Sequence, residues 1–258
     1  MTALLQNKVA IVTGSARTGS ESAHSCAQGI GAAIAIELAR NGASVVLNYV
    51  APTSKGRAEE VAQTIEAFGS KALVLQADVA NLDDLDNLVK QTVATFGKID
   101  ILVNNAGVVG FEPIGAITPE TYQKIFDINV RPVIFLSQAA VAHMGEGGRI
   151  INVSSTAARQ GNPTTAVYAA SKAAMEGITR VMGIELRDKG IRVNAVAPGP
   201  VTTDMFTSAS PEVQEHFKSL FPLGEPSDIA DSVLFLASPA SRWITGTTLN
   251  TNNGVILS

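Results

Sequence analysis

Short apolar runs alternate with longer amphipathic segments along almost the whole chain, and this alternation constrains the fold more than any other feature. Parallel strands cannot be joined by a tight turn, so each pair needs a crossover of about a dozen residues or more, usually a helix. The apolar runs lie at 9–13, 44–48, 71–76, 99–104, 149–154, 191–197 and 245–251. The helical segments lie at 29–40, 54–68, 82–96, 119–130, 132–144, 165–189, 211–220 and 227–237. This pattern predicts an α/β fold, a single Rossmann-like doubly wound parallel sheet of about seven strands with helices on both faces.

Composition narrows the class of protein. The 258 residues carry a net charge of −4, with 46% hydrophobic and 16% charged residues, which predicts one globular domain spanning 1–258. The absence of a Lys and Arg cluster argues against a nucleic-acid partner. No apolar run approaches the roughly 20 residues that cross a bilayer, and the first strand starts at Val9, which leaves no room for a signal peptide. Because the chain has one cysteine, Cys26, we expect a cytoplasmic protein without disulfides.

Small or polar residues stand at the end of almost every predicted strand. In an open parallel sheet, a ligand binds at the carboxyl ends of the strands, near the point where the strand order reverses. The residues at those ends are Thr13 and Gly14; Asn48 and Tyr49; Asp78 and Val79; Asn104, Asn105, Ala106 and Gly107; Ser154 and Ser155; and Pro198 and Gly199. Any single one could be an ordinary turn, because turn residues follow most strands. Together they predict a dinucleotide site, where glycines let a cofactor approach the backbone.

Tyr168 and Lys172 lie four residues apart on a predicted helix, so their side chains share one face. A free tyrosine has a pKa of about 10, too high for efficient proton exchange at neutral pH, and a nearby ammonium group lowers it. Ser155 follows the strand at 149–154 and is placed to hydrogen-bond a substrate carbonyl. These residues predict acid–base catalysis on a carbonyl or an alcohol, although a Tyr–Lys pair at this spacing also occurs on ordinary amphipathic helices.

Taken in order, these motifs make the chain similar to the short-chain dehydrogenase/reductase family over essentially its whole length. The matching residues are Thr13, Gly14, Gly29, Ile30, Gly31, Asp78, Asn104, Asn105, Ala106, Gly107, Asn129, Ser155, Tyr168, Lys172, Pro198, Gly199 and Thr203. Within the family the chain most resembles the ketoacyl- and fungal naphthol-type ketoreductases, on the segments 46–49 and 197–199.

The resemblance implies a role for each catalytic residue. Tyr168 would be the general acid in ketone reduction or the base in alcohol oxidation, and Ser155 would orient the carbonyl. Lys172 would lower the pKa of Tyr168 and hold the nicotinamide ribose, while Asn129 would hold a water that links Lys172 to solvent. The reaction would be hydride transfer between nicotinamide C4 and a carbonyl carbon.

The resemblance also implies a set of cofactor-binding residues. They are Gly14, Arg17, Gly29, Ile30, Gly31, Asn48, Asp78, Val79, Asn105, Ala106, Gly107, Tyr168, Lys172, Pro198, Gly199, Val201 and Thr203. Asp78 and Val79 would contact the adenine, the segment 105–107 the adenosine ribose side, and the segment 198–203 the nicotinamide carboxamide. No metal is expected, because the three histidines, at positions 24, 143 and 216, have no ligand spacing.

The end of the second strand predicts the choice of cofactor. An acidic residue there would accept both ribose hydroxyls of NAD and repel a 2′-phosphate. The position reads Asn48 and Tyr49, without an acid, and Arg17, Lys55 and Arg57 are available for a phosphate, along with the hydroxyl at position 54. We therefore expect NADP(H) rather than NAD(H), although Lys55 and Arg57 could equally be ordinary surface residues.

The segment 18–28 departs from the family, whose members pass from the position of Arg17 directly into Gly29, Ile30 and Gly31. It is polar, lacks a hydrophobic period and reads as a loop. It could leave the glycines close in space, because loop-closure entropy grows only slowly with length. Alternatively, it could displace the phosphate-facing backbone and weaken the cofactor site, or be a product of transcript processing. The segment 250–254, where the family commonly has an acid before paired glycines, is a second departure.

Three classes of function follow. The first is an NADP(H)-dependent ketoreductase acting on a small-molecule carbonyl or secondary alcohol. The second is a family scaffold with a weakened cofactor site, acting as a non-redox or binding protein, and the third is another family reaction such as isomerisation or imine reduction. The expected substrate pocket comprises Val108, Phe111, Gln160, Asn162, Met205 and Phe206, covered by the loop 202–225. The apolar helices at 132–144 and 165–189 would pair with their copies in a homotetramer or homodimer, or simply be buried on the sheet.

Overall fold

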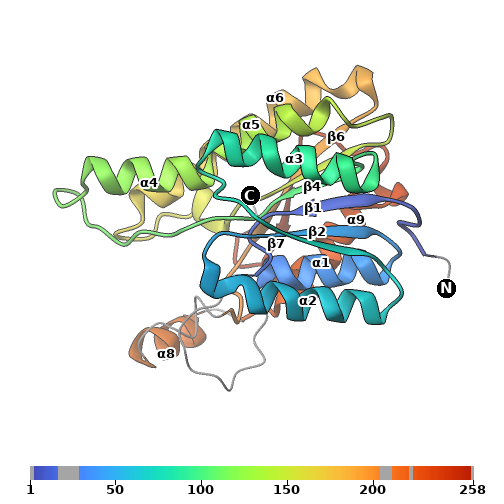
Figure 1. The fold of residues 1–258 in the computed structure, drawn as a ribbon. Coiled ribbons are helices and arrows are strands. Elements are labelled where there is room, and N and C mark those ends of the chain that lie inside the picture. The colour runs from blue at the N-terminus through green and yellow to red at the C-terminus, as the bar shows by residue number, and fades with distance from the viewer. Residues whose placement is uncertain (1–2, 17–28, 204–210, 221–222, 257–258) are drawn as a thin grey trace.

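The computed structural model describes residues 3–16, 29–203, 211–220 and 223–256, and these form the layered α/β fold of Figure 1. Its strands lie in one seven-stranded sheet in the order β3-β2-β1-β4-β5-β6-β7, and every neighbouring pair is parallel. Their bounds are β1 Val9–Val12, β2 Ser44–Tyr49, β3 Ala72–Gln76, β4 Ile101–Asn104, β5 Arg149–Val153, β6 Arg192–Pro198 and β7 Thr248–Thr251. The strand order reverses between β1 and β4, so a ligand crevice is expected where these two strands end. The predicted Rossmann-like doubly wound sheet is confirmed.

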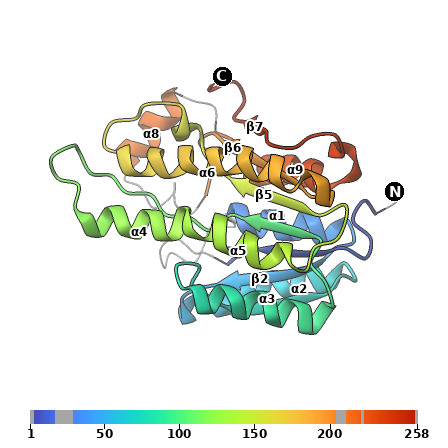
Figure 2. The ribbon, with the colours of Figure 1, turned by 90° about the horizontal axis from the view of Figure 1, so that it is seen from above.

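Helices cover both faces of the sheet, as the crossovers between parallel strands require. In Figures 1 and 2, α3, α5 and α6 lie on one face and α1 and α2 on the other, where α9 packs against α1. The helices are α1 Ile30–Arg40, α2 Lys55–Ala67, α3 Leu82–Phe96, α4 Pro119–Asn129, α5 Arg131–Val141, α6 Ala166–Glu185, α8 Pro211–Leu220 and α9 Pro226–Ala237. Short 3₁₀ helices are η1 Pro52–Ser54, η2 Thr156–Ala158, η3 Arg187–Lys189 and η4 Pro239–Ser241.

The strands divide the apolar side chains between two cores because successive residues point to opposite faces. On β2, Val45 and Leu47 join the core under α1 and α9, whereas Val46 joins the core under α3 and α5. On β1, Val12 and Ile11 divide in the same way. Both faces are therefore buried, which explains why the strands read as continuous apolar runs.

Some element boundaries differ from the sequence expectation. The helix expected at 132–144 is α5, which starts one residue earlier, with Pro132 in its first turn, and ends at Val141. The helix expected at 165–189 ends at Glu185, and the chain tightens into η3 before Gly190, which adopts a left-handed φ of 70°. The last strand starts at Thr248 instead of residue 245, because the chain first turns through a glycine at 246 with φ 73°.

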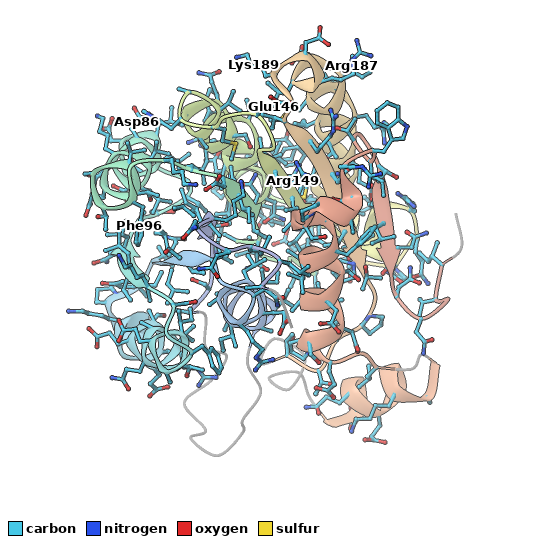
Figure 3. All side chains as sticks on the ribbon, turned by 90° about the vertical axis from the view of Figure 1, so that its right-hand side faces the viewer. Asp86, Phe96, Glu146, Arg149, Arg187 and Lys189 are labelled. Atoms are coloured by element: carbon cyan, nitrogen blue, oxygen red, sulfur yellow. The ribbon has the colours of Figure 1, made fainter. Side chains whose placement is uncertain are left out.

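Arg149 is the first residue of β5 and lies where the parallel strands begin, away from the carboxyl ends at which a ligand is expected. It is 7% exposed, and its guanidinium donates to the carbonyl oxygens of Gly147 and Gly148 at 2.8 and 3.1 Å. Burial lowers the pKa of Arg149, and Arg192 on the next strand lowers it further. In the side view of Figure 3 it lies within the fold, whereas Arg187 and Lys189 lie at the periphery. This arginine therefore fixes the entry of β5 into the sheet.

Candidate active site

The turn after β1 is built around the hydroxyl of Thr13. Its Oγ1 donates to the carbonyl of Val103 at 3.3 Å and accepts from the backbone N–H groups of Asn105 and Ala106, both at 3.0 Å. The Asn105 side chain completes the link by donating to the Thr13 carbonyl at 2.8 Å. The ends of β1 and β4 are thereby locked together at the switch point. The sequence placed Thr13 in the glycine motif, but it could not predict that its hydroxyl links β1 to the end of β4, because the partner residues lie about 90 positions away in the chain.

Two glycines of the motif are required by close backbone approach. Gly14 adopts a φ of 64°, and a Cβ there would come within 3.0 Å of the Ala106 Cα. A Cβ at Gly31 would lie 2.6 Å from the Gly14 carbonyl oxygen and 2.5 Å from the Asn105 Nδ2. Gly29 precedes α1, and Ile30 opens this helix. The start of α1 therefore lies directly against the turn after β1, as a dinucleotide phosphate site requires.

The residues expected on the adenosine side lie in different environments. Asn48 is 2% exposed, and its side chain accepts from the Gly14 N–H at 3.2 Å and donates to the Ala77 carbonyl at 2.9 Å. It therefore braces the glycine turn against the end of β3. Asp78 is exposed and accepts from the Ala80 N–H at 2.9 Å, whereas Val79 is buried. Arg17 and the segment 18–28 lie outside the described residues.

The end of β6 forms the opposite side of the crevice. Pro198 is buried, and Gly199 packs so closely on β7 that a Cβ would come 3.0 Å from the Cβ of Asn252. Val201 is 7% exposed and pairs with Gly224 in an isolated bridge. The Thr203 N–H donates to the Val201 carbonyl at 2.8 Å. These residues thus line the strand end that continues toward α8.

The expected catalytic residues converge beside Gly107. Tyr168 and Lys172 lie one turn apart on α6, and the Lys172 Nζ stands 5.8 Å from the centre of the Tyr168 ring. A Cβ at Gly107 would lie 3.4 Å from both the Lys172 Nζ and the Asn129 Oδ1, so a glycine keeps this space open. Ser155 lies two residues after the end of β5 and caps η2, because its hydroxyl accepts from the backbone N–H of Ala157 at 3.2 Å. These four side chains come from three separate elements, and only the fold brings them together.

The two ionisable groups at this point have shifted pKa values. Burial raises the pKa of the Tyr168 hydroxyl, and its hydrogen bond with Ser155 opposes this rise. Burial lowers the pKa of Lys172 to about 8, and its ammonium donates to the carbonyl of Val153 at 2.8 Å. The role expected of Lys172, to lower the pKa of Tyr168, stays a prediction, because the raised pKa of Tyr168 reflects its burial. Burial therefore favours the protonated form of the Tyr168 phenol.

Asn129 is fully buried and clamps the segment after β4. Its Oδ1 accepts from the Val108 N–H at 2.8 Å, and its Nδ2 donates to the Val108 carbonyl at 2.9 Å. The Nδ2 also donates to the Ser171 hydroxyl at 3.0 Å, and that hydroxyl donates to the Tyr168 carbonyl at 2.7 Å. Sequence reasoning missed Ser171, although its position between Tyr168 and Lys172 was a usable signal.

The expected substrate side is partly described. Phe111 is 67% exposed and does not pack in the core. The next residue, Glu112, donates its N–H to the Thr164 carbonyl at 2.7 Å, which joins the loop after β4 to the loop after η2. Thr164 adopts a φ of 68°, which is strained for a β-branched residue. Val108, Gln160 and Asn162 lie on these same two loops, while Met205 and Phe206 fall outside the described residues.

The part of the chain that the structure describes, residues 3–16, 29–203, 211–220 and 223–256, has neither a membrane-spanning helix nor a cluster of metal ligands. In these ranges no helix is long and apolar enough to cross a membrane. The same ranges hold no group of three or more His, Cys, Asp or Glu side chains arranged as metal ligands.

Comparison with known proteins gives the family. A family model described as enoyl-(acyl carrier protein) reductase matches residues 26–256. A versicolorin reductase of Emericella nidulans is 42% identical over 266 residues, covering 97% of this chain and 96% of that protein. A hydroxynaphthalene reductase of Aspergillus fumigatus is 40% identical and covers 94% of this chain and 90% of its own length. A solved short-chain dehydrogenase from Burkholderia cenocepacia, in complex with NADP, is 38% identical with a TM-score of 0.88, covering 97% of this chain and 98% of that one.

These relatives extend over nearly the whole chain, and they include reductases of the fungal naphthol type. The resemblance in the sequence motifs is therefore confirmed by the fold and by the relatives. The chain belongs to the short-chain dehydrogenase/reductase family of oxidoreductases.

Proposed function

We propose that this protein is an NADP(H)-dependent ketoreductase that interconverts a small-molecule carbonyl and a secondary alcohol. The observation that carries the proposal is a series of contacts at the edge of the sheet where dinucleotides bind. Ser155 lies beside Tyr168, Tyr168 lies beside Lys172, and Lys172 lies beside Gly107. A neutral phenol next to a hydroxyl suits donation of a proton to a carbonyl oxygen. An NADPH bound there would supply the hydride to the carbonyl carbon.

The chain's own residues divide the remaining work. Ser155 holds the substrate oxygen by a hydrogen bond and keeps it near the Tyr168 hydroxyl, to which Ser155 is already bonded. Tyr168 gives its proton to that oxygen, and the buried Lys172, with its pKa of about 8, stabilises the resulting phenolate. Asn129 fixes the segment after β4, against which the nicotinamide ribose would lie. In alcohol oxidation the same groups act in reverse, with Tyr168 as the base.

Support for NADP(H) comes from the region where β2 ends. The residue after β2 is Val50, and the first turn of α2 contains no acid. Lys55 and Arg57 lie in that first turn, where the helix N-terminus also favours an anion. A 2′-phosphate therefore meets cations instead of a carboxylate at this position, and one relative of the chain was solved with NADP.

We assign the cofactor contacts as expected from the sequence. Gly14, Gly29, Ile30 and Gly31 face the phosphates, with Arg17 beside the 2′-phosphate. The adenosine contacts are Asp78, Val79, Asn105, Ala106 and Gly107, and the nicotinamide contacts are Pro198, Gly199, Val201 and Thr203, with Tyr168 and Lys172 at the ribose. Asn48 supports this site by bracing Gly14.

We infer that the segment 202–225 covers the substrate. Its two ends are held together next to the crevice, because the Thr202 N–H donates to the Gly224 carbonyl and the Gly224 N–H donates to the Pro200 carbonyl, both at 2.9 Å. The exposed Phe111 and Ile114 on the loop after β4 give the pocket an apolar rim. A medium-sized, partly apolar carbonyl compound suits such a rim.

We infer further that the protein is a cytoplasmic homo-oligomer, a homotetramer or a homodimer. The outer faces of α5 and α6 expose Ile134, Phe135, Val181 and Ile184. Between them lies an apolar groove of about 430 Å³. Contiguous exposed apolar surface of this kind marks interaction sites, and a second copy of α5 and α6 would cover it around a two-fold axis. Light scattering of the protein and of Val181→Asp tests this, since a monomeric wild-type protein contradicts it.

The alternative of a non-redox binding protein is not favoured, because the relatives that match nearly the whole chain are reductases. The decisive experiment is a panel of ketones with NADPH or NADH, run on the full chain, on Tyr168→Phe and on a chain lacking 18–28. We expect reduction with NADPH and a loss of about 100-fold or more in kcat for Tyr168→Phe, with NADPH binding retained. Failure to bind NADPH at millimolar concentration, or equal turnover by Tyr168→Phe, would refute the proposal.

A further inference from the structure

A buried carboxylate lies on α6 beyond the catalytic residues. The Glu176 side chain is 6% exposed, and both of its oxygens are occupied. Its Oε1 accepts from the Ser154 hydroxyl at 3.1 Å, and its Oε2 accepts from the Arg159 Nε at 3.1 Å. A terminal nitrogen of Arg159 lies 3.1 Å from the same Oε2 in an ion pair. Arg159 in turn donates from its other terminal nitrogen to the Asn250 Oδ1 at 3.1 Å. We call Ser154, Arg159, Glu176 and Asn250 the Glu176–Arg159 junction.

The junction joins the elements that carry the proposed reaction. Ser154 directly precedes Ser155, and Arg159 follows η2, which Ser155 caps, so both sides of Ser155 are held. Glu176 lies four residues after Lys172 and eight after Tyr168, on the same face of α6. Lys172 also ties α6 to this segment, because its ammonium donates to the Val153 carbonyl at 2.8 Å and its carbonyl accepts from the Ser154 hydroxyl at 3.4 Å. Glu176 adds the buried carboxylate that links both sides of Ser155 to α6.

The junction also reaches the nicotinamide end of the crevice. Asn250 lies on β7, and the next residue, Thr251, accepts from the Gly199 N–H at 3.1 Å. Asn252 packs against the Cα of Gly199 so closely that no Cβ fits there. Arg159 thus connects the loop of Ser155 to the strand that supports Gly199.

We propose that Glu176 and Arg159 are positioning residues that set the distance between Ser155 and Tyr168, an inference that rests on the proposed ketoreductase function. Neither residue is among those assigned to substrate or cofactor. They act because a charge-assisted hydrogen bond within an ion pair is shorter and stronger than a neutral hydrogen bond, and because the helical backbone keeps Tyr168 and Lys172 in register with Glu176. When the junction breaks, the loop of Ser155 shifts while α6 stays in place.

A shift of about 1 Å at a reacting group costs on the order of 100-fold in rate. For Glu176→Gln and Arg159→Met we therefore expect kcat to fall by about 10- to 100-fold. The dissociation constant of NADPH should change by less than about twofold, because the phosphate and adenosine contacts are untouched. The double variant should lose no more than the worse single variant, since the two side chains act as one unit. Arg159→Lys keeps the charge but cannot donate to Glu176 and Asn250 from separate nitrogens, so it should recover only part of kcat.

If the Glu176–Arg159 junction had only a structural role, its loss would lower the stability of the protein and leave catalysis unchanged. Asp100→Asn is the control for such a purely structural ion pair. Asp100 is a comparably placed carboxylate whose side chain is 13% exposed and accepts from Lys8 and Lys98 at 3.1 and 2.9 Å. It also accepts from the Val9 N–H at 2.9 Å, at the edge of the sheet opposite the active site. Its removal should lower the melting temperature and leave kcat unchanged well below that temperature.

The first readout is kinetic, using NADPH deuterated at the transferred position. If the junction positions Ser155, Glu176→Gln and Arg159→Met should show a lower kcat and an isotope effect on kcat at least as large as that of the wild-type protein, because hydride transfer becomes slower. Asp100→Asn should match the wild-type protein in both quantities. Wild-type kcat in the junction variants, or losses that merely follow the melting temperature as in Asp100→Asn, would overturn the inference.

The second readout does not need turnover and separates this inference from the proposed function. The hydroxyl-bearing carbon of Tyr168 gives a ¹³C resonance, assigned by its loss in Tyr168→Phe, that responds to the hydrogen bond with Ser155. Glu176→Gln and Arg159→Met should move this resonance in the direction that Ser155→Ala moves it, and Asp100→Asn should not. An unmoved resonance overturns the inference even if the enzyme is active. A moved resonance in a protein that reduces no ketone supports the junction and refutes only the assigned reaction.

Discussion

Replacing Gly31 by alanine tests the close packing of the glycine motif. The new Cβ would lie 2.6 Å from the Gly14 carbonyl oxygen and 2.5 Å from the Asn105 Nδ2. The first contact involves backbone, which cannot rotate away, and the second involves an amide that donates to the Thr13 carbonyl at 2.8 Å and to the Gly14 carbonyl at 3.3 Å. Either α1 moves away from the turn or Asn105 gives up these bonds.

The magnitude follows from three opposing effects. Alanine favours the helix by about 1 kcal/mol relative to glycine. Overpacking costs about 1–3 kcal/mol, and the disturbed Asn105 hydrogen bonds cost about 1 kcal/mol each. The free energy of unfolding of the variant should therefore be about 2–4 kcal/mol lower than that of the wild-type protein. Because the displaced backbone would face the dinucleotide phosphates, the dissociation constant of NADPH should rise by about tenfold or more.

Denaturant unfolding and fluorescence titration with NADPH measure these two quantities. Gly177→Ala is the control, because within one chain its Cβ would meet nothing closer than a terminal nitrogen of Arg180 at 3.8 Å, and it should gain up to about 1 kcal/mol. Because Gly177 lines the groove between α5 and α6, light scattering must show that this variant keeps the oligomeric state of the wild-type protein. If Gly31→Ala proves as stable as Gly177→Ala and binds NADPH like the wild-type protein, α1 does not approach the turn as described.

Three further predictions use other parts of the molecule. Burial lowers the pKa of Lys172 from 10.5 to about 8, so the folded state loses this proton at a lower pH than the unfolded state and the free energy of unfolding should rise between pH 8 and 10, by up to about 3 kcal/mol. Unfolding curves across that range should lack this rise in Lys172→Met. A variant with the pH profile of the wild-type protein would refute the shifted pKa. Thr164→Asn should raise the melting temperature, since asparagine tolerates the φ of 68° better than a β-branched residue, and a lower melting temperature would show that the threonine side chain matters more than the strain. Replacing both Lys55 and Arg57 by alanine should raise the KM for NADPH about tenfold while that for NADH changes little, and equal effects on both cofactors would exclude a 2′-phosphate contact.

Much of the fold could be predicted because the pattern of apolar residues is periodic. The strands are continuous apolar runs because both of their faces are buried, as Val45, Val46 and Leu47 show on β2. Element ends were harder to predict, since tertiary contacts and turn geometry decide them. The left-handed Gly190 lies after the true end of α6, and nothing local in 165–189 marks the tightening into η3 before it.

The sequence predicted which side chains share a helix face in the candidate site, but it did not predict their pKa shifts. Sequence spacing placed Tyr168 and Lys172 on one face of α6, which the structure bears out. It could not show that burial raises the pKa of Tyr168, because desolvation depends on residues from several elements. The Glu176–Arg159 contact also joins side chains whose partners, at 154 and 250, are distant in the chain.

The sequence alone determined the succession of strands and helices along the chain, because this depends on local periodicity, and its resemblance to the family supplied the candidate glycines and reacting side chains. The tertiary structure decided which side chains meet at the switch point, which ionisable groups are desolvated, and which buried charges hold the loops in place. Those properties depend on contacts between distant segments, and burial and hydrogen bonding act only once such segments have been brought together.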